Sequence, residues 1–342
     1  MSLPDLMGQG AEAAMALFGQ AQESLFEGAV QPVMYRVGLA SFLSDAYNAT
    51  GWLLVGLLQI AVMLLVISPL QRSRPAEPWA GSPALRQQVR ADVRADVIYT
   101  LIHRLGLFRV AMFFAIDPIW NAGFGWLAVQ GVDGWHLDQW IAPLWPGLSD
   151  SALVGFVAYL VVFDALNYLL HRAQHRFNWW WALHAVHHSQ RHMSMWTDSR
   201  NHVLDSMIID SLFVIAARVI GVAPGQFVAL IALSQLVENL AHANLRLSFG
   251  WLGERLLVGP AFHRLHHGIG LGHESAGKGT LGGCNFAVLF PVWDVLFGTA
   301  RFGVPAQPTG IRDQLPEEGG RDYGRGFWAQ QWLGAKRLFG AA

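Results

Sequence analysis

Cysteine and charged residues are both scarce in this sequence of 342 residues. The single Cys284 cannot form an internal disulfide, so disulfides give the fold no framework. Charged residues make up 14% of the chain, well below the roughly one quarter that is usual in soluble domains. The formal net charge is −1 and no basic block occurs, which argues against nucleic acid as a partner. Residues 1–50 also lack a basic segment followed by an apolar one, so no cleavable signal peptide is expected.

Hydrophobic residues take the place of the missing charges. They make up 53% of the chain and include 15 Trp and 20 Phe, so we expect an all-α integral membrane protein. Apolar runs of about 20 residues are long enough for a helix to cross a bilayer. The sequence predicts about five transmembrane or re-entrant helices, at residues 51–70, 105–130, 151–170, 203–222 and 226–241.

The last two of these helices form a predicted hairpin through Ala223, Pro224 and Gly225. Ionisable residues at membrane depth usually face the interior of a bundle and mark a functional site. The hairpin contains four such residues, Asp205, Asp210, Arg218 and Glu238.

The distribution of basic residues predicts how the helices are oriented. Only two of the 23 basic residues are lysines, a bias that suggests a GC-rich bacterial genome, so the expected location is a bacterial inner membrane. Residues 110–170 contain neither Lys nor Arg, whereas Asp133, Asp138 and Asp150 lie there. Because positive residues concentrate on the cytoplasmic side, we expect the loop around these aspartates outside the cytoplasm. The Arg-rich segments expected inside are 71–104, 171–202 and everything after 242.

Histidine is concentrated in three short clusters that hold eight of the 14 histidines. They are His171 with His175, His184 with His187 and His188, and His263 with His266 and His267. Residues three and four apart share one face of a helix, so each cluster points its imidazoles at one spot. Imidazole is a ligand of iron, zinc, copper and nickel. Eight imidazoles exceed the four to six ligands of one ion, so the sequence predicts two metal ions.

In these clusters the chain resembles the fatty acid hydroxylase/sterol desaturase superfamily of membrane di-iron oxygenases, over roughly residues 151–300. The histidine boxes occur in the family's order, HxxxH, HxxHH and HxxHH. Flanking residues that strengthen the resemblance are Phe163, Asp164, Tyr168, Val186, Ser189, Arg200, His202, His242, Asn244, Pro260, Phe262 and the closing run Trp293 to Thr299.

The resemblance implies a membrane-embedded catalytic domain at 105–300, preceded by a tail, first span and linker at 1–104. Residues 301–342 are then a cytoplasmic surface tail, and the boxes form a histidine-rich helical cap. The implied activity is O2-dependent hydroxylation of an unactivated C–H bond in a membrane lipid, at two iron ions for which zinc could substitute. Electrons are expected from an external partner, a ferredoxin or cytochrome with its reductase. A sterol-like lipid, a fatty acyl chain and an ether lipid are all candidate substrates.

Further site residues are expected around the eight box histidines. His242 is the candidate ninth ligand, while His202 could ligate or stand aside. Asp164 precedes His171 by seven residues on the same helical face, so it is the first candidate to accept the free ring N–H of a ligand. Asp205, Glu238 and Asp294 follow as candidates for the same role, and Asp294 is equally expected to act only as a helix cap. Asn285 joins Asp164 as a candidate catalytic residue.

Aromatic residues near the boxes allow two further expectations. Trp179, Trp180 and Trp181 are interpreted as a belt at the membrane interface. Together with Trp196, Phe262 and Phe286, they predict an apolar slot that a lipid enters from the bilayer. At the C-terminus, apolar and basic residues alternate between Arg325 and Phe339, which is typical of a helix lying on the membrane surface.

Three alternative functions use the same histidines. A metal transporter would place its ligands along a path through the bilayer, whereas these clusters lie at the ends of spans on one side. A cytochrome with two histidines on its haem needs single histidines on facing helices, which the triplets fit poorly. A lipid desaturase would use the same site and remove a second hydrogen atom.

Overall fold

The computed structural model describes residues 3–79, 82–132, 134–141, 143–144, 152–270, 283–305 and 307–341, and within these ranges the chain is helical and forms no strand. The N-terminal half contains α1 (Leu3–Leu25), η1 (Phe26–Val30), α2 (Gln31–Arg36), η2 (Ala40–Phe42), α3 (Leu43–Val62), η3 (Met63–Ile67), α4 (Ser68–Ser73), α5 (Pro83–Arg104), α6 (Leu107–Ala115), α7 (Asp117–Val129) and α8 (Leu137–Ile141). The C-terminal half contains α9 (Ala152–Arg176), α10 (Asn178–His188), η4 (Thr197–Ser199), α11 (Val203–Ile220), α12 (Pro224–His242), α13 (Gly250–Leu256), α14 (Pro260–His266), α15 (Val292–Leu296), η6 (Arg312–Gln314), η7 (Pro316–Glu318) and α16 (Phe327–Leu338).

Two continuous helices are long and apolar enough to cross a membrane. One runs from Ala40 to Ser73 through η2, α3, η3 and α4, and the other runs from Leu153 to Arg176 in α9. They contain the predicted spans 51–70 and 151–170. The helices α5 and α6 make a third candidate only if they are taken together across a bend of 53°.

The predicted single helix at 105–130 is two helices in the structure, so this prediction was wrong. Pro118 lies in the first turn of α7, where a proline is tolerated because that turn has no intrahelical acceptor for its missing N–H. In the interior of one continuous helix the ring of Pro118 would break the helix. The chain therefore turns at Ile116 and starts a new helix at Asp117.

The predicted hairpin at 203–241 forms as α11 and α12, joined through Gly221, which has the left-handed φ of 77°. Neither helix is among the candidate spans of the described residues. Three charged residues interrupt α11, and Glu238 with several amides and hydroxyls interrupts α12. The structure therefore supports two or three spans by length and composition, and the count of five stays a prediction.

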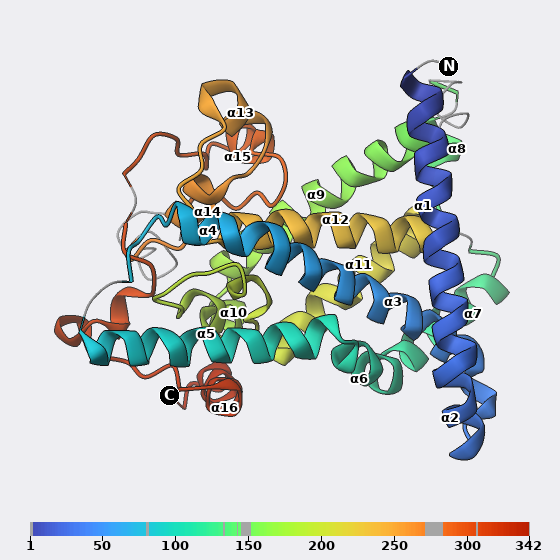
Figure 1. Cartoon of the computed structure of the whole chain (residues 1–342), viewed down its shortest axis with the longest axis horizontal. Helices are drawn as coiled ribbons and strands as arrows, with labels where there is room; N and C mark the ends of the chain where they lie inside the picture. Colours follow the sequence, from blue (N-terminus) through green and yellow to red (C-terminus); the bar gives the residue numbers. More distant parts are fainter. Residues whose placement is uncertain are drawn as a thin grey trace.

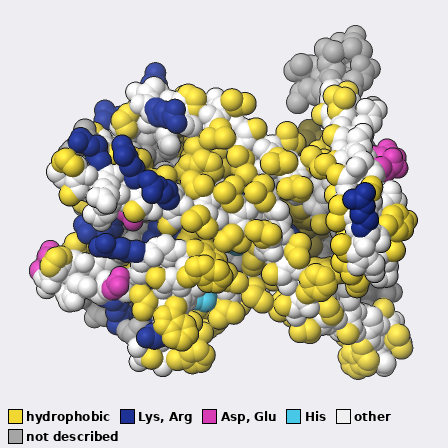
Figure 2. Space-filling view, turned by 60° about the horizontal axis from the view of Figure 1, so that its bottom comes forward, with side chains coloured by type: hydrophobic (Ala, Val, Ile, Leu, Met, Phe, Trp, Pro, Cys, Tyr) yellow, Lys and Arg dark blue, Asp and Glu magenta, His cyan; other side chains and the backbone are white. Residues whose placement is uncertain are grey.

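The molecule is elongated, with α1 standing across one end and the long helices running away from it toward α13, α14 and α15 (Figure 1). Hydrophobic side chains cover the middle of the face seen in Figure 2, while most Lys and Arg side chains of that face gather at the end opposite α1. This segregation suits a protein whose middle lies in lipid. The orientation across the membrane stays a prediction, and Asp133 and Asp150, on which part of it rests, lie outside the described residues.

Close packing of the long helices places the site between them. A cluster of buried residues from α9, α11 and α12 includes Phe163, Phe213 and Leu230. On the other side, α3 approaches α5 so closely that a Cβ atom on Gly56 would lie 1.8 Å from the carbonyl oxygen of Arg104. Only glycine allows this contact, which fixes the C-terminal end of α5 beside the bundle.

The predicted surface helix at the C-terminus is α16, and one side of it docks onto α10. Arg337 donates to the carbonyl of Ala182 over 3.3 Å, while Trp328 and Phe339 on the other side are each 82% exposed. The helix is thus amphipathic as predicted, and its inner side is part of the protein core.

Candidate metal centre

The three histidine boxes lie at the ends of three helices that meet in the interior. His171 and His175 lie one turn apart near the end of α9. The second box ends α10, which starts again after the break at Phe177, and the third box ends the short helix α14, which begins at Pro260. All eight box histidines and His242 are at most 7% exposed. Burying so many polar rings is costly without partners. The cluster therefore requires partners for its ring nitrogens, such as metal ions.

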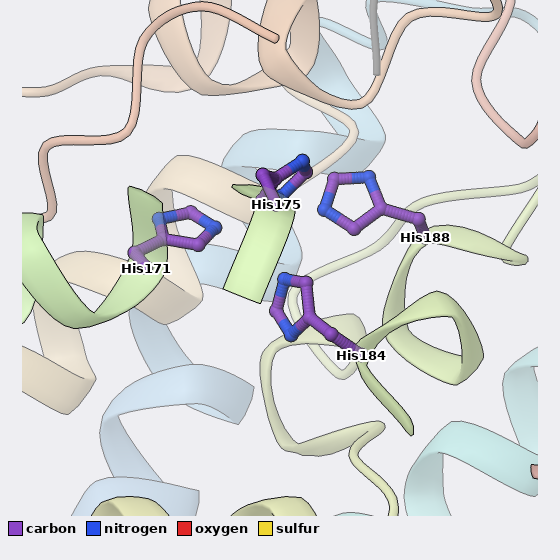
Figure 3. A group of neighbouring side chains, drawn as sticks. All are labelled: His171, His175, His184 and His188. Atoms are coloured by element: carbon purple, nitrogen blue, oxygen red, sulfur yellow. The ribbon is translucent and has the colours of Figure 1, made fainter. Parts of the chain in front are cut away.

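The ring nitrogens converge into groups that match metal coordination. His171, His175, His184 and His188 form one group (Figure 3), and each residue offers one nitrogen within 4.8 Å of all the others. The second group of four has the same spacing and consists of His187, His242, His263 and His267. A third group, His188, His266 and His267, shares one member with each of the others. The structure thus brings together all nine predicted ligands, eight in two adjoining sets of four and His266 in the group that connects them.

Hydrogen bonds fix which nitrogen faces inward in four of these residues. The Nδ1 of His171 donates to the carbonyl of Phe286 over 2.8 Å, and that of His266 donates to Cys284 over 2.7 Å. His242 donates from Nδ1 to the carbonyl of Glu238 over 2.7 Å, and His184 faces Asp205 over 3.2 Å. A carbonyl or carboxylate can only accept, so Nδ1 carries the proton in a neutral ring. The Nε2 lone pair of each ring is therefore directed into the centre.

The inward nitrogens of neighbouring rings lie close together. Nε2 of His242 lies 3.1 Å from that of His187 and 2.9 Å from that of His263. Nε2 of His266 lies 3.2 Å from that of His188. Separations of this size are those of neighbouring ligands about 2.1 Å from one cation. The donor set and its geometry therefore fit two metal ions.

Burial also favours the neutral, ligating form of the rings outside the spans. It lowers the pKa of His266 to about 3, and it lowers the pKa values of His187, His188, His263 and His267 well below 6.5. Neighbouring histidines add to the effect by repelling a proton. These rings are thus neutral near pH 7, and no proton has to leave before a metal binds.

The loop after the third box supplies the two carbonyl groups that orient His171 and His266. Asp294 accepts hydrogen bonds from the backbone N–H groups of Phe286 and Ala287, over 2.9 and 2.7 Å. Asp164 accepts from the N–H groups of Leu289 and Phe290, over 2.9 and 3.0 Å, and from the indole of Trp293. The prediction that Asp164 accepts the ring N–H of His171 was therefore wrong, because the carbonyl of Phe286 is the partner of that ring and Asp164 is connected to the metal ligands only through this loop. The catalytic role of Asp164 stays a prediction.

Asn285 lies between the two orienting carbonyl groups. Its φ is +59°, a left-handed conformation that asparagine tolerates better than most residues. Its amide donates to the carbonyls of Phe262 and Arg301, over 3.0 Å each, and accepts from the N–H of Arg301 over 2.7 Å. These bonds hold the loop against α14. A catalytic role of Asn285 likewise stays a prediction.

Asp205 was a second-choice candidate to accept the ring N–H of a ligand, and its carboxylate makes this contact with His184. Besides His184, it accepts hydrogen bonds from Gln174 over 2.8 Å and from the indole of Trp180 over 2.7 Å. Trp181 packs its ring against His175 and His188, with ring centres 5.0 and 5.3 Å apart. The interpretation of all three tryptophans as an interfacial belt was therefore wrong, because only Trp179 is exposed.

The remaining histidines lie outside the centre. His202 caps α11 by accepting from the N–H of Leu204 and donates from Nε2 to Gln331, so both ring nitrogens are engaged away from the metal groups. His192 pairs with Asp92 over 2.8 Å, and its side chain is 12% exposed. Burial raises the pKa of the Cys284 thiol to about 11, which makes it unreactive near pH 7.

A cavity of about 220 Å³ opens beside the centre, between α5, α6, α9, α11 and α12. His171, His184, His187, His242 and His263 line one end of it. None of the six aromatic residues from which the apolar slot was predicted lines this cavity. Its apolar wall consists instead of Phe108, Phe163, Ile209, Phe213, Leu230, Ile231 and Val288.

Comparison with known proteins agrees with the site. The family described as fatty acid hydroxylase matches residues 156–299, which contain all nine histidines of the centre. An alkylglycerol monooxygenase of Danio rerio is 31% identical over 44% of this chain and 31% of its own length. An ornithine lipid hydroxylase OlsE of Rhizobium tropici is 27% identical over 63% of this chain and 58% of its own length. An alkylglycerol monooxygenase of Caenorhabditis elegans is 29% identical over 40% of this chain and 25% of its own length.

The matched region thus spans from a quarter to somewhat more than half of these relatives. No solved structure shows a significant match to the chain. The family match, the order of the boxes and the relatives agree on one assignment. Residues 156–299 of this chain thus match the fatty acid hydroxylase family, and the relatives are similar over the same region.

Proposed function

We propose that this protein is a lipid monooxygenase that holds two iron ions and inserts one atom of O2 into a C–H bond of a membrane lipid. The observation that carries the proposal is the pair of adjoining four-histidine groups within a fatty acid hydroxylase domain. Bound iron would supply the activation of O2, for which no side chain has the oxidising power. The overall reaction consumes R–H, O2, two electrons and two protons, and yields R–OH and water.

The protein's own contribution is orientation and exclusion of water. The carbonyl groups of Cys284, Phe286 and Glu238 and the carboxylate of Asp205 hold four imidazoles in the tautomer that ligates through Nε2. Burial keeps the rings neutral and the centre dry, which protects reactive species from side reactions. The neighbouring cavity places a substrate beside five of the ligands.

A lipid substrate is supported by the relatives and by the surface. The relatives are named for alkylglycerol and for an ornithine lipid, which are both lipids. The apolar middle of the molecule and its two to three candidate spans suit an enzyme that works within a membrane. We place it in a bacterial inner membrane with the centre on the cytoplasmic side, where the Arg-rich segments 71–104 and 171–202 are expected.

The two electrons are proposed to come from an acidic ferredoxin or cytochrome with its reductase. Arg86, Arg90 and Arg94 repeat every four residues along an exposed face of α5. On another face of α5, Asp96 accepts hydrogen bonds from Gln190 and Arg200, in the segment that follows the second histidine box. A carrier bound to the arginine stripe would thus lie one helix away from the centre.

Isotope labelling tests the proposal. The full chain, purified with iron and supplied with a ferredoxin and its reductase, is given membrane lipid under 18O2. We expect a lipid that has gained one 18O atom, and no such product from a His187→Ala variant. A lipid product with a new double bond and no 18O would establish a desaturase instead. Metal analysis that finds fewer than two ions per chain in the active protein would contradict the two-ion centre.

A further inference from the structure

The cavity beside the metal centre has a polar side whose residues are arranged along the helices that hold the ligands. Asn167 lies one turn before His171 on α9, and Ser234 lies two turns before His242 on α12, with Glu238 between them. Ser206 on α11 lines the cavity next to Asp205. One helical turn is about 5.4 Å, so Asn167 and Ser234 lie within one or two turns of a metal ligand, and Ser206 lies beside the carboxylate that contacts His184.

Three of these side chains keep their hydrogen-bonding capacity available. Among the described residues, none forms a hydrogen bond with the side chains of Asn167, Ser206 or Ser234. The charged groups of the lining, in contrast, are partly paired. Arg104 binds Asp198 over 2.9 Å, and Arg109 binds Asp210 over 2.5 Å. Both arginines of the cavity wall are thus neutralised, and neither is left to bind a phosphate.

This lining selects what can occupy the cavity. A hydrocarbon chain would cover the amide and hydroxyl groups without replacing their bonds to water, at a cost of about 1–3 kcal/mol for each group. A chain that already lies in the bilayer gains almost nothing by moving to another apolar site. A neutral polar group of the lipid satisfies the amide and hydroxyls, while Phe163, Phe213 and Leu230 on the apolar wall accept the adjoining methylenes.

The size of the cavity points the same way. A cavity of about 220 Å³ is somewhat larger than a cavity of about 150 Å³ that holds one benzene molecule, a ring of six carbon atoms. It therefore accommodates a short polar segment with a few carbon atoms, and the rest of the lipid has to remain outside.

We infer that the oxidised carbon lies within a few bonds of a neutral hydrogen-bonding group of the lipid, such as a hydroxyl, ether, ester or amide, which Asn167, Ser206 and Ser234 hold. This inference rests on the proposed lipid monooxygenase and specifies where on the lipid it acts. In the reaction a C–H bond and the O–O bond break, a C–O bond forms, and the second oxygen atom leaves as water with two electrons from the external donor.

The position of the label tests the inference. Membranes of a bacterial host that contain the full, iron-loaded chain are supplemented with 1-hexadecanoylglycerol and exposed to 18O2, and every lipid that gains one 18O is fragmented by tandem mass spectrometry. We expect the label on the fragment that contains the polar group and its first few carbons. Label in the middle or at the methyl end of a chain would overturn the inference and leave the monooxygenase proposal intact. Absence of 18O from every lipid would refute both.

Two variants connect the position of the label to these residues. Asn167→Leu and Ser234→Ala should each lower kcat/KM by about tenfold, the effect of losing about 1.4 kcal/mol of binding, and should spread the label over more carbons at unchanged iron content. Ser211→Ala is the matched control, because Ser211 is buried on α11 and is not part of the cavity lining. A label that stays on the same carbon in both variants, with wild-type kcat/KM, would remove these residues from the inference.

Discussion

The carboxylate of Asp205 receives hydrogen bonds from three side chains, His184, Gln174 and Trp180, and no Lys or Arg of the described residues forms an ion pair with it. A carboxylate behind a ligating imidazole fixes its tautomer and strengthens the ring as a ligand. We therefore expect Asp205→Asn, which keeps the shape and removes the charge, to weaken iron retention about 10- to 100-fold. Competition with a chelator measures this, and Asp92→Asn serves as the control because Asp92 pairs with His192 outside the centre. Equal retention in both variants would contradict the role given to Asp205.

His266 tests the count of two ions, because it belongs to the group that connects the two four-histidine sets. We expect His266→Ala to abolish hydroxylation and to reduce the metal content below two ions per chain. The protein should still be found in the membrane, because the long helices satisfy their backbone hydrogen bonds internally. His192→Ala should retain both ions and activity. Full activity of His266→Ala, measured beside elemental analysis, would refute the assignment.

The site residues differ in how well sequence could predict them. The eight box histidines follow from spacing, since residues three and four apart on a helix share a face. Asp164 was favoured over Asp205 by the same rule, but a common face does not establish contact. Asp205 lies on α11 and reaches His184 through tertiary packing, for which no local spacing rule exists. The carbonyls of Cys284 and Phe286 carry no sequence signal at all, because every residue has one.

At the scale of one element, the loop from Cys284 to Arg301 determines how His171 and His266 are oriented. Asn285→Gly should lose the side-chain hydrogen bonds and keep the left-handed backbone, whereas Asn285→Ala should lose the bonds and strain the backbone by a further ~1 kcal/mol. We expect iron retention and melting temperature to fall in the order wild type, Gly, Ala. Wild-type values for both variants would show that the loop needs no such anchor.

Helix existence was predicted better than helix continuity. The span 151–170 contains no proline, and in 51–70 Pro69 lies near the end, after the π-helical turn η3, so both spans lie within the two long candidate helices. The segment 105–130 is equally apolar, yet Pro118 divides it, and α6 instead follows α5 across Gly106, whose φ is +83°. A hydropathy average does not detect such a break in a helix, because it measures composition and not backbone hydrogen bonding. The docking of α16 on α10 could not be predicted from the sequence either, because the amphipathic pattern predicts a buried face and not the helix that covers it.

At the scale of the molecule, the arginine stripe on α5 predicts that electron transfer depends on charge. Reversing it with Arg90→Glu and Arg94→Glu should slow anaerobic reduction of the iron by an acidic ferredoxin about tenfold or more at low salt, because steering by opposite charges is lost. Reduction by dithionite should be unchanged, since this small reductant needs no docking surface. Arg325→Glu, an exposed reversal beside α16, is the control. Equal ferredoxin rates in the double variant and the wild type would exclude α5 as the docking surface.

The last prediction concerns the side of the membrane on which the centre lies. Residue 138 precedes α9 and the C-terminus follows it, and α9 is a candidate span whose last two turns contain His171 and His175. The hairpin of α11 and α12 returns the chain to the same side whether it crosses twice or re-enters, so an odd number of crossings separates the two points in either case. Reporter fusions at residues 138 and 342 should therefore report opposite compartments, with the C-terminus in the cytoplasm. The same compartment for both would mean that α9 does not cross. The metal centre would then not lie at the membrane surface, where lipid reaches it from the bilayer and electrons reach it from the cytoplasm.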